Sequence, residues 1–261
     1  MQIAEPDVAR CPASKPCRND QVPWDKFDSG AYLSKNYKTL RDDDRMIMEV
    51  VRDFFADSAK VPDARALDVG SGTNLYPVLA MLPFCDRLDL VEISASNVAW
   101  LDREIKEFSG FSATWDDFWR VYTERDEYAH FDPRVEIARK AEIWQDSVFK
   151  LPARRWDLGT MFFVACSLST EETEFRAALH RFIGALRHGA PLAAAFMVNS
   201  TGYQVGDWVF PAVDVNAEKV EQALASVAYD VCITSIGLGA DPLREGYEGM
   251  IVATGKAANQ D

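Results

Sequence analysis

The stretch Leu67-Asp68-Val69-Gly70-Ser71-Gly72-Thr73 decides the fold, because a buried strand turns sharply through two glycines toward a helix. Glycines let backbone N–H groups approach a ligand that a Cβ atom would keep away. A second strand with an acidic end, Leu88-Asp89-Leu90-Val91-Glu92, follows about twenty residues later. A carboxylate at this spacing is typical of one that binds the two hydroxyls of a ribose. The two motifs together predict a site for a nucleoside cofactor.

The charge of the chain argues against two classes of partner. Among 261 residues, 28 Lys and Arg stand against 41 Asp and Glu, a net charge of −13. Nucleic acids and anionic membranes both need a basic surface, so we expect neither as a partner. No apolar stretch is long enough to span a membrane. The first residues lack the basic start and apolar core of a signal peptide.

The cysteines and histidines predict neither a disulfide framework nor a metal site. The five cysteines are scattered along the chain at Cys11, Cys17, Cys85, Cys166 and Cys232, and only three histidines are present. Free thiols in a reducing cytoplasm are the favoured interpretation, and a bridge between Cys11 and Cys17 is the alternative. We therefore expect a cytoplasmic protein without a bound metal.

The chain divides into a loose N-terminal arm at 1–22 and one domain at 23–261. An aromatic-rich segment at 24–37 precedes the first strand and predicts a lid or cap. The helix expected at 42–55 starts with Asp42-Asp43-Asp44, which predicts a solvated helix start that favours the helix dipole. A helical insertion is expected at about 109–141, where Trp115, Trp119 and Tyr122 share one helix face and predict packing.

Strand and helix patterns alternate along the rest of the chain. Strands are expected at 65–69, 87–92, 142–145, 156–164, 191–198, 231–237 and 249–255, and helices at 75–81, 97–108, 172–186 and 217–228. The last two strands are separated only by a loop, so they should pair antiparallel. This pattern predicts a doubly wound, mostly parallel seven-stranded α/β sheet, Rossmann-like, with an antiparallel C-terminal strand pair. Ligands of such sheets bind beyond the carboxyl ends of the strands.

Three motifs in this order carry a resemblance to a known family. They are Asp68-Val69-Gly70-Ser71-Gly72, Glu92 with Asn97 five residues later, and the upstream Ala31-Tyr32-Leu33-Ser34-Lys35-Asn36-Tyr37. Together they resemble the nicotinamide/phenylethanolamine/thioether N-methyltransferase family of class I methyltransferases. The likeness covers about 27–257 and implies S-adenosylmethionine (SAM) as the cofactor.

The resemblance implies a role for each matching position. Tyr32 and Tyr37 would close the cap over the methionine part of SAM. The remaining cofactor-binding positions would be Gly70, Ser71, Gly72, Tyr76, Glu92, Asn97, Asp146, Ser147 and Phe162. Of these, Glu92 would take the ribose hydroxyls, and Asp146 with Ser147 would flank the adenine.

The sequence departs from the family pattern at positions that would bind the methyl acceptor. Where family enzymes often carry an acid at the end of the fifth strand, this chain has Phe196, which argues against nicotinamide as a substrate. We expect the acceptor to contact Phe196, Asn199, Ser200 and Tyr203, and the catalytic residues to be Tyr32, Asn199 and Tyr203. Because strands alternate their faces, at most two of Phe162, Phe163 and Phe196 should face the ligand.

Three functions stay open at this point. The first is methyl transfer to a small molecule of secondary metabolism, in which alignment and desolvation supply most of the rate. The second is a SAM cyclase, in which the amine of SAM attacks its own chain, releases methylthioadenosine and forms azetidine-2-carboxylate, with Asn199, Ser200 and Tyr32 holding the curled chain. The third is a protein that binds SAM without catalysis. The oligomeric state stays open too.

Overall fold

A seven-stranded sheet forms the centre of the computed structural model, which describes residues 16–58, 62–106, 114–237, 243 and 246–259. The strand order is β3-β2-β1-β4-β5-β9-β8. The strands are β1 (Arg65–Val69), β2 (Arg87–Glu92), β3 (Ala141–Gln145), β4 (Leu158–Phe162), β5 (Pro191–Met197), β8 (Ala228–Ile236) and β9 (Met250–Ala257). β1 to β5 pair in parallel, whereas β9 runs antiparallel to both β5 and β8. The expected fold class, including the antiparallel C-terminal pair, is confirmed.

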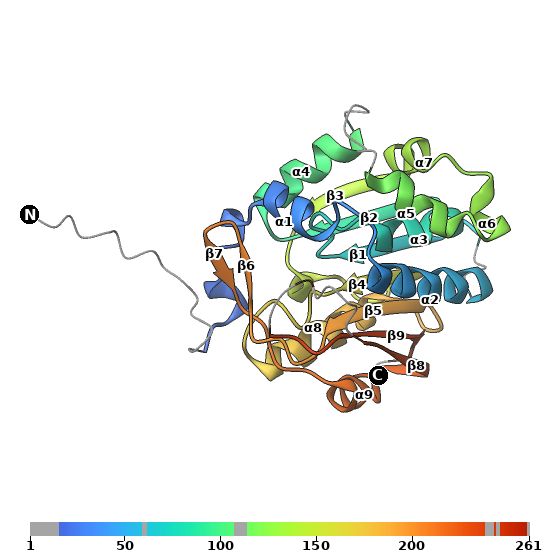
Figure 1. Ribbon diagram of the computed structural model, residues 1–261. Helices are drawn as coiled ribbons and strands as arrows, with labels where there is room; N and C mark the ends of the chain where they lie inside the picture. Colours follow the sequence, from blue (N-terminus) through green and yellow to red (C-terminus); the bar gives the residue numbers. More distant parts are fainter. Residues whose placement is uncertain (1–15, 59–61, 107–113, 238–242, 244–245, 260–261) are drawn as a thin grey trace, which may run out of the picture.

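Helices cover both faces of this sheet (Figure 1). On one face lie α2 (Asp42–Ser58), α3 (Tyr76–Met81) and α4 (Ala95–Lys106), and on the other lie α8 (Glu172–Ala185) and α9 (Ala217–Leu224). The connections run from β1 outward to β3, then return across the sheet to β4 beside β1. Loops leave the carboxyl ends of β1 and β4 in opposite directions, which opens a crevice at this point.

Within residues 114–140, three helices precede β3. They are α5 (Thr114–Tyr122), α6 (Asp126–Ala129) and α7 (Pro133–Lys140), where α7 begins at the capping side chain of Asp132. The Tyr122 hydroxyl donates to the Tyr76 carbonyl at 2.7 Å, and the Tyr128 hydroxyl donates to the Ala80 carbonyl at 2.8 Å. These bonds and the buried Trp115 fix the segment against α3, so its aromatic face serves packing.

The N-terminal segment and a β-hairpin form one aromatic cap. The segment contains the short helical turns η1 (Asn19–Gln21) and η2 (Trp24–Lys26) and the helix α1 (Ser29–Asn36). The hairpin consists of β6 (Tyr203–Val205) and β7 (Trp208–Phe210). The ring of Phe210 lies 5.5 Å from Trp24, 5.1 Å from Phe27 and 5.6 Å from Tyr203, measured between centroids. The aromatic cap expected from the sequence is therefore present, but it includes a hairpin that was not predicted.

Residues 16–22, which were expected in a loose arm, pack against the domain. The Cys17 N–H donates to Thr170 Oγ1 at 2.8 Å, and the Asn19 N–H donates to Glu174 Oε2 at 2.8 Å. Cys17 is disulfide-bonded, so the expectation of free thiols is wrong at this position. Cys85, Cys166 and Cys232 carry free thiols, and Cys11 lies outside the described residues.

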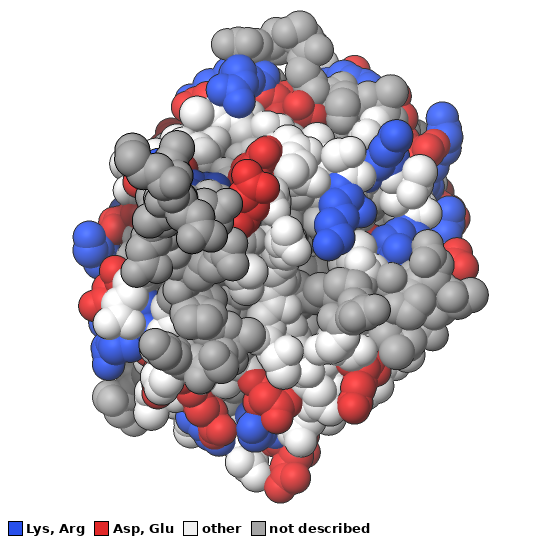
Figure 2. Space-filling view, turned by 60° about the vertical axis from the view of Figure 1, so that its left-hand side comes forward, with Lys and Arg blue, Asp and Glu red and all other residues white. Residues whose placement is uncertain are grey.

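The surface of the described residues fits the acidic composition. Acidic and basic side chains are interspersed on the face seen in Figure 2, and the described residues there form no continuous basic patch. Within the described ranges, no helix has the length and apolar character needed to cross a bilayer.

Candidate active site

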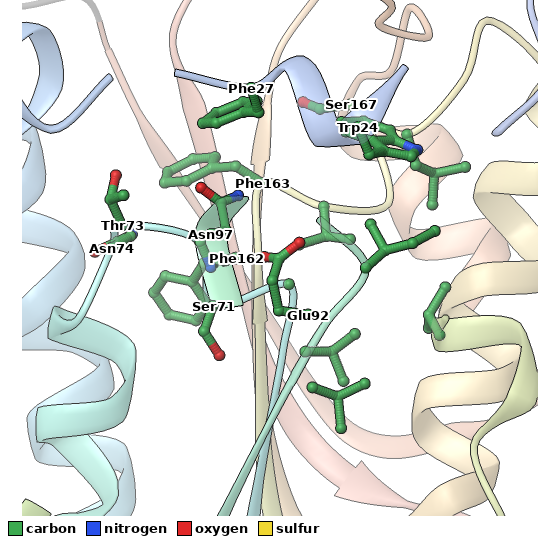
Figure 3. Close-up of a pocket in the computed structure, with 18 of the residues that line it drawn as sticks. Trp24, Phe27, Ser71, Thr73, Asn74, Glu92, Asn97, Phe162, Phe163 and Ser167 are labelled. Atoms are coloured by element: carbon green, nitrogen blue, oxygen red, sulfur yellow. Dashed lines mark hydrogen bonds between the residues drawn. The ribbon is translucent and has the colours of Figure 1, made fainter. Parts of the chain in front are cut away.

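The glycine turn after β1 forms the floor of the main cavity, which opens at the crevice between β1 and β4 (Figure 3). Gly70 and Gly72 have φ angles of 67° and 49°, which favour glycine. A Cβ atom on Gly70 would lie 2.3 Å from Val164 Cγ2, too close for any other residue. A Cβ on Gly72 would lie 3.8 Å from Glu92 Oε2, which is an ordinary contact distance, so glycine is favoured here by its φ angle.

Glu92 ends β2 and turns its carboxylate into the main cavity. Its side chain is buried, with Oε2 accepting from the Gly72 N–H at 2.9 Å and Oε1 accepting from the Ser94 N–H at 2.8 Å. Burial raises the pKa of Glu92, while these backbone donors act in the opposite direction. Each oxygen keeps further acceptor capacity, and a pair of vicinal hydroxyls can satisfy it.

Asn97 ties the cap to this carboxylate. The Ser29 hydroxyl of α1 donates to Asn97 Oδ1 at 2.7 Å, and the Asn97 side chain also hydrogen-bonds with Glu92. Nearby, Ser96 Oγ donates to the Phe27 carbonyl at 2.8 Å, and the Ala95 N–H donates to an oxygen of the Asp25 side chain at 2.8 Å. The first turn of α4 therefore positions both the acidic site and the segment that covers it.

Two polar side chains that follow the glycine turn were not predicted as site residues. Thr73 and Asn74 are buried and line the main cavity; Thr73 Oγ1 has no hydrogen-bond partner in the described structure, whereas the Asn74 side chain is hydrogen-bonded to Tyr76. A buried polar atom without a partner costs about 1–3 kcal/mol, so such atoms mark a place where a polar ligand binds. Their position directly after Gly72 was the signal that could have identified them.

Asp146 and Ser147 line the side of the main cavity next to β3. The Asp146 N–H donates to the Glu92 carbonyl at 3.0 Å, which holds the end of β3 beside the end of β2. The Asp146 carboxylate accepts from the Ser147 N–H at 2.8 Å. Val148, the first residue of η4 (Val148–Lys150), adds an apolar contact surface. The flat apolar and polar groups here suit an aromatic base.

Aromatic rings form the remaining walls. Trp24 and Phe27 of the cap lie across the main cavity from Ser71 and Glu92 (Figure 3). The other aromatic residues that line it are Tyr32, Tyr37, Phe162, Phe163 and Tyr203. Phe163 has a φ of 60°, a strained conformation for a bulky side chain, and its N–H donates to the Ala195 carbonyl at 2.7 Å.

Eleven of the predicted site residues meet at the main cavity. They are Tyr32, Tyr37, Gly70, Ser71, Gly72, Glu92, Asn97, Asp146, Ser147, Phe162 and Tyr203. Tyr76 lies behind the wall instead, with its ring stacked on Phe118 at 6.0 Å and edge-on to Phe162 at 5.7 Å. It supports Phe162 from the core.

Three predicted acceptor-binding residues lie elsewhere. Phe196 is fully buried with its ring 5.9 Å from Phe175 of α8, because alternate residues of β5 face opposite layers. The Asn199 amide donates to Glu248 Oε2 at 2.6 Å, and its φ of 53° belongs to the turn after β5. Ser200 is fully buried and lines neither the main cavity nor the second cavity next to it, which is described below. None of the three lines the main cavity, so this geometry gives no support to the acceptor role expected for Phe196 and Ser200 or to the acceptor and catalytic roles expected for Asn199.

A second space, the side cavity, opens next to the main cavity and shares five of its lining residues. The shared residues are Tyr32, Tyr37, Phe163, Ser167 and Tyr203, and the further lining residues are Asn36, Asp44, Met197, Leu243 and Met250. Met197 precedes the turn after β5 and takes the place expected for Phe196. The two cavities therefore adjoin and have aromatic walls in common.

Asp44 and its neighbour are buried, contrary to the expected solvated helix start. Asp43 is 4% exposed and Asp44 is 3% exposed, and Asp44 lines the side cavity. Asp43 accepts from Arg41 Nε at 3.1 Å and from Arg41 Nη2 at 3.3 Å. Burial raises the pKa of Asp44 to about 7, the charge of Asp43 adds to this rise, and Tyr76 and Arg41 oppose it.

The described residues contain no cluster of three or more His, Cys, Asp or Glu side chains that could hold a metal ion.

Comparisons with known proteins agree with this geometry. Residues 18–254 match the NNMT/PNMT/TEMT family. Phenylethanolamine N-methyltransferase of Mus musculus is 24% identical over 242 residues, covering 80% of this chain and 76% of the relative. The N-methyltransferase NodS from Bradyrhizobium japonicum, solved with S-adenosyl-L-homocysteine (SAH), aligns with a TM-score of 0.51 at 15% identity, over 88% of this chain and 99% of NodS. The CurJ carbon methyltransferase aligns with a TM-score of 0.53 at 14% identity, over 87% of this chain and 58% of CurJ.

The unpartnered Oγ1 of Thr73 and the carboxylate of Glu92, both in the lining of the main cavity, fit the polar groups of SAM. The family match extends over most of the chain and includes every one of these positions. The chain therefore belongs to the NNMT/PNMT/TEMT family and has the fold of a SAM-dependent methyltransferase.

Proposed function

We propose that this protein transfers the methyl group of SAM to a small molecule that binds in the side cavity. The observation that carries the proposal is that the side cavity shares Tyr32, Phe163 and Tyr203 with the main cavity. These rings stand at the boundary where a methyl donor and an acceptor would meet. When bound, SAM supplies a methyl group on a positively charged sulfur.

We assign cofactor binding to the main cavity. Glu92 accepts the ribose hydroxyls, oriented by the Gly72 and Ser94 N–H groups at 2.9 and 2.8 Å. Thr73 bonds the polar end of the methionine chain with its Oγ1, which otherwise lacks a partner. Asp146 and Ser147 flank the base.

The aromatic cap contributes to the reaction by excluding water and by facing the positive charge. A cation over an aromatic face gains on the order of 2 kcal/mol when the site is desolvated. Tyr32 and Tyr203 have ring centroids 6.4 Å apart, so both can lie near the same sulfonium. Burial keeps the Tyr37 hydroxyl protonated by raising its pKa, so it acts as a neutral hydrogen-bond donor.

Alignment of two bound molecules accounts for most of the expected rate, and this mechanism assigns no residue the role of a general base. The cyclase alternative depended on Asn199, Ser200 and Tyr32 to hold a curled methionine chain. Of these three, only Tyr32 lines the main cavity, which favours methyl transfer.

The test is to incubate pure protein with SAM alone, and then with a panel of small amines, thiols and phenols. We expect no turnover with SAM alone, and release of SAH when an acceptor is added. Formation of methylthioadenosine with SAM alone would contradict the proposal and indicate cyclisation. Binding of SAM without turnover across the whole panel would contradict it too, and would indicate a non-catalytic binder.

A further inference from the structure

A further space, the edge pocket, lies at the β3 edge of the sheet. β2 supplies Asp89 and Val91 to its lining, β3 supplies Trp144, and the segment that leads to β4 supplies Trp156. The crossover from β3 to β4, at 146–157, contains the short turn η4 in place of an α-helix. The edge pocket has a volume of about 140 Å³, close to that of a cavity that can hold one benzene molecule. It therefore has room for one aromatic ring.

One buried carboxylate fixes two indole rings of the edge pocket. Asp89 Oδ1 accepts from Trp144 Nε1 at 3.2 Å, and Asp89 Oδ2 accepts from Trp156 Nε1 at 2.5 Å. Arg65 binds the same carboxylate with Nε at 2.5 Å and Nη2 at 2.9 Å, so its cation balances the charge of Asp89. Asp89 therefore orients the two rings and adds little negative charge to the pocket.

Trp144 presents aromatic surface to a ligand in the edge pocket. Trp144 is 46% exposed, although the hydrogen bond of its N–H edge to Asp89 holds the ring in one orientation. A ring that is already fixed loses little side-chain freedom when a flat ligand stacks on it. Leu151 and Pro152, from the turn before β4, add apolar surface to the same pocket. This lining suits a planar aromatic ring.

Arg155 gives the edge pocket a positive charge. Its guanidinium carbon lies 5.4 Å from the centroid of the Trp156 ring, and Arg155 takes part in none of the ion pairs formed among the described residues. The second carboxylate of the lining, that of Asp146, has Lys150 Nζ at 3.7 Å. Because the charges of Asp89 and Asp146 are each balanced by a cation, the charge of Arg155 favours an anionic ligand.

We propose that the edge pocket binds a small planar aromatic carboxylate, whose ring stacks on Trp144 and whose carboxylate pairs with Arg155. The pocket shares Val91 and Asp146 with the main cavity, so such a ligand would be a neighbour of the cofactor. Its other lining residues belong to neither the main cavity nor the side cavity, and the inference does not depend on the proposed reaction. A neutral analogue loses the ion pair, and a saturated ring loses the stacking.

The experiment titrates three matched compounds into the protein saturated with SAH, which fills the main cavity. They are phenylacetate, the neutral phenylacetamide and the saturated cyclohexylacetate, and calorimetry measures each affinity. The variants are Arg155→Gln and Trp144→Ala. The control is Arg154→Gln, which removes the exposed guanidinium next in sequence, outside the lining of the edge pocket. Circular dichroism and thermal unfolding check that each variant is folded.

We expect wild type and Arg154→Gln to bind phenylacetate on the order of fivefold tighter than phenylacetamide, the size of effect that an exposed ion pair supplies. Cyclohexylacetate should bind more weakly than phenylacetate, because a saturated ring does not stack. Arg155→Gln should bind phenylacetate and phenylacetamide equally, and Trp144→Ala should lose on the order of tenfold in affinity for phenylacetate. Equal affinity for phenylacetate in wild type and both variants would overturn the inference, as would absence of binding to wild type.

Discussion

Replacement of Asp44 by asparagine should stabilise the protein, by an amount that grows as the pH rises. Asp44 is 3% exposed, and its pKa rises from 3.8 to about 7 on folding. A carboxyl group whose pKa is raised in the folded state is harder to ionise there than in the unfolded chain. Wild-type stability therefore falls as the pH rises above 3.8, and the fall levels off above about 7.

The magnitude follows from this rise in pKa. At a pH where the Asp44 carboxyl group is ionised in both the folded and the unfolded state, it lowers the free energy of unfolding by about 4 kcal/mol. At pH 5 the cost is smaller, on the order of 2 kcal/mol, because the folded carboxyl is still protonated. The stabilisation by Asp44→Asn should thus be larger at pH 8 than at pH 5 by on the order of 2–3 kcal/mol, which corresponds to roughly 5–10 °C in Tm.

The assay is thermal unfolding of ligand-free wild type, Asp44→Asn and Asp42→Asn from pH 5 to pH 8. Asp42 is exposed on the same turn of α2, so its replacement should shift the Tm by a similar small amount at every pH. A difference in Tm between wild type and Asp44→Asn that stays constant over this range would refute the reasoning about the buried carboxylate.

Three further predictions concern the walls of the two cavities. Gly70→Ala should unfold well below wild type in thermal melts, because its Cβ would lie 2.3 Å from Val164 Cγ2 at a φ of 67°, and a wild-type Tm would contradict the close contact. Thr73→Val should weaken SAM binding on the order of fivefold in calorimetry, since the unpartnered Thr73 Oγ1 is available to the ligand, and unchanged affinity would remove it from the site. Tyr203→Ala should lower turnover more than SAM affinity because Tyr203 lines both cavities, and the reverse result would assign it to cofactor binding alone.

The sheet was predictable because its strands are strongly apolar and bounded by clear turns. β1 and β2 have the expected bounds, and the other five strands differ from expectation by a few residues at either end. The hairpin of β6 and β7 was missed because each strand has only three residues. The pair Gly206-Asp207 between two apolar runs was its signal, since glycine favours such turns, and Gly206 has a φ of 56°.

The cofactor-binding side of the site was predictable because its residues stand at, or come directly after, the ends of predicted strands. Gly70, Gly72 and Glu92 lie where their motifs place them, at adjacent carboxyl ends. The residues of the acceptor-binding side could not be predicted, because β5 is buried along its whole length. With apolar residues on both faces, nothing in the pattern distinguishes Phe196, which faces α8, from Met197, which faces the side cavity.

The buried charge at the start of α2 also depends on tertiary structure. A run of three aspartates at a helix start ordinarily faces water and favours the helix dipole. Here the loop that follows α1 brings Arg41 against Asp43 and buries both Asp43 and Asp44. The N-terminal segment is a similar case, since the partners of Cys17 and Asn19, which are Thr170 and Glu174 respectively, are far away in the sequence.

Calorimetric titration of SAM into wild type and Glu92→Ala tests most directly whether the carboxylate at the end of β2 binds the cofactor. We expect the variant to keep the wild-type circular dichroism spectrum and to lose SAM affinity on the order of a hundredfold or more, because it loses charge-assisted hydrogen bonds to the ribose. Glu218→Ala, which removes an exposed carboxylate from α9, should bind SAM like wild type. A folded Glu92→Ala variant with near-wild-type SAM affinity would contradict the account.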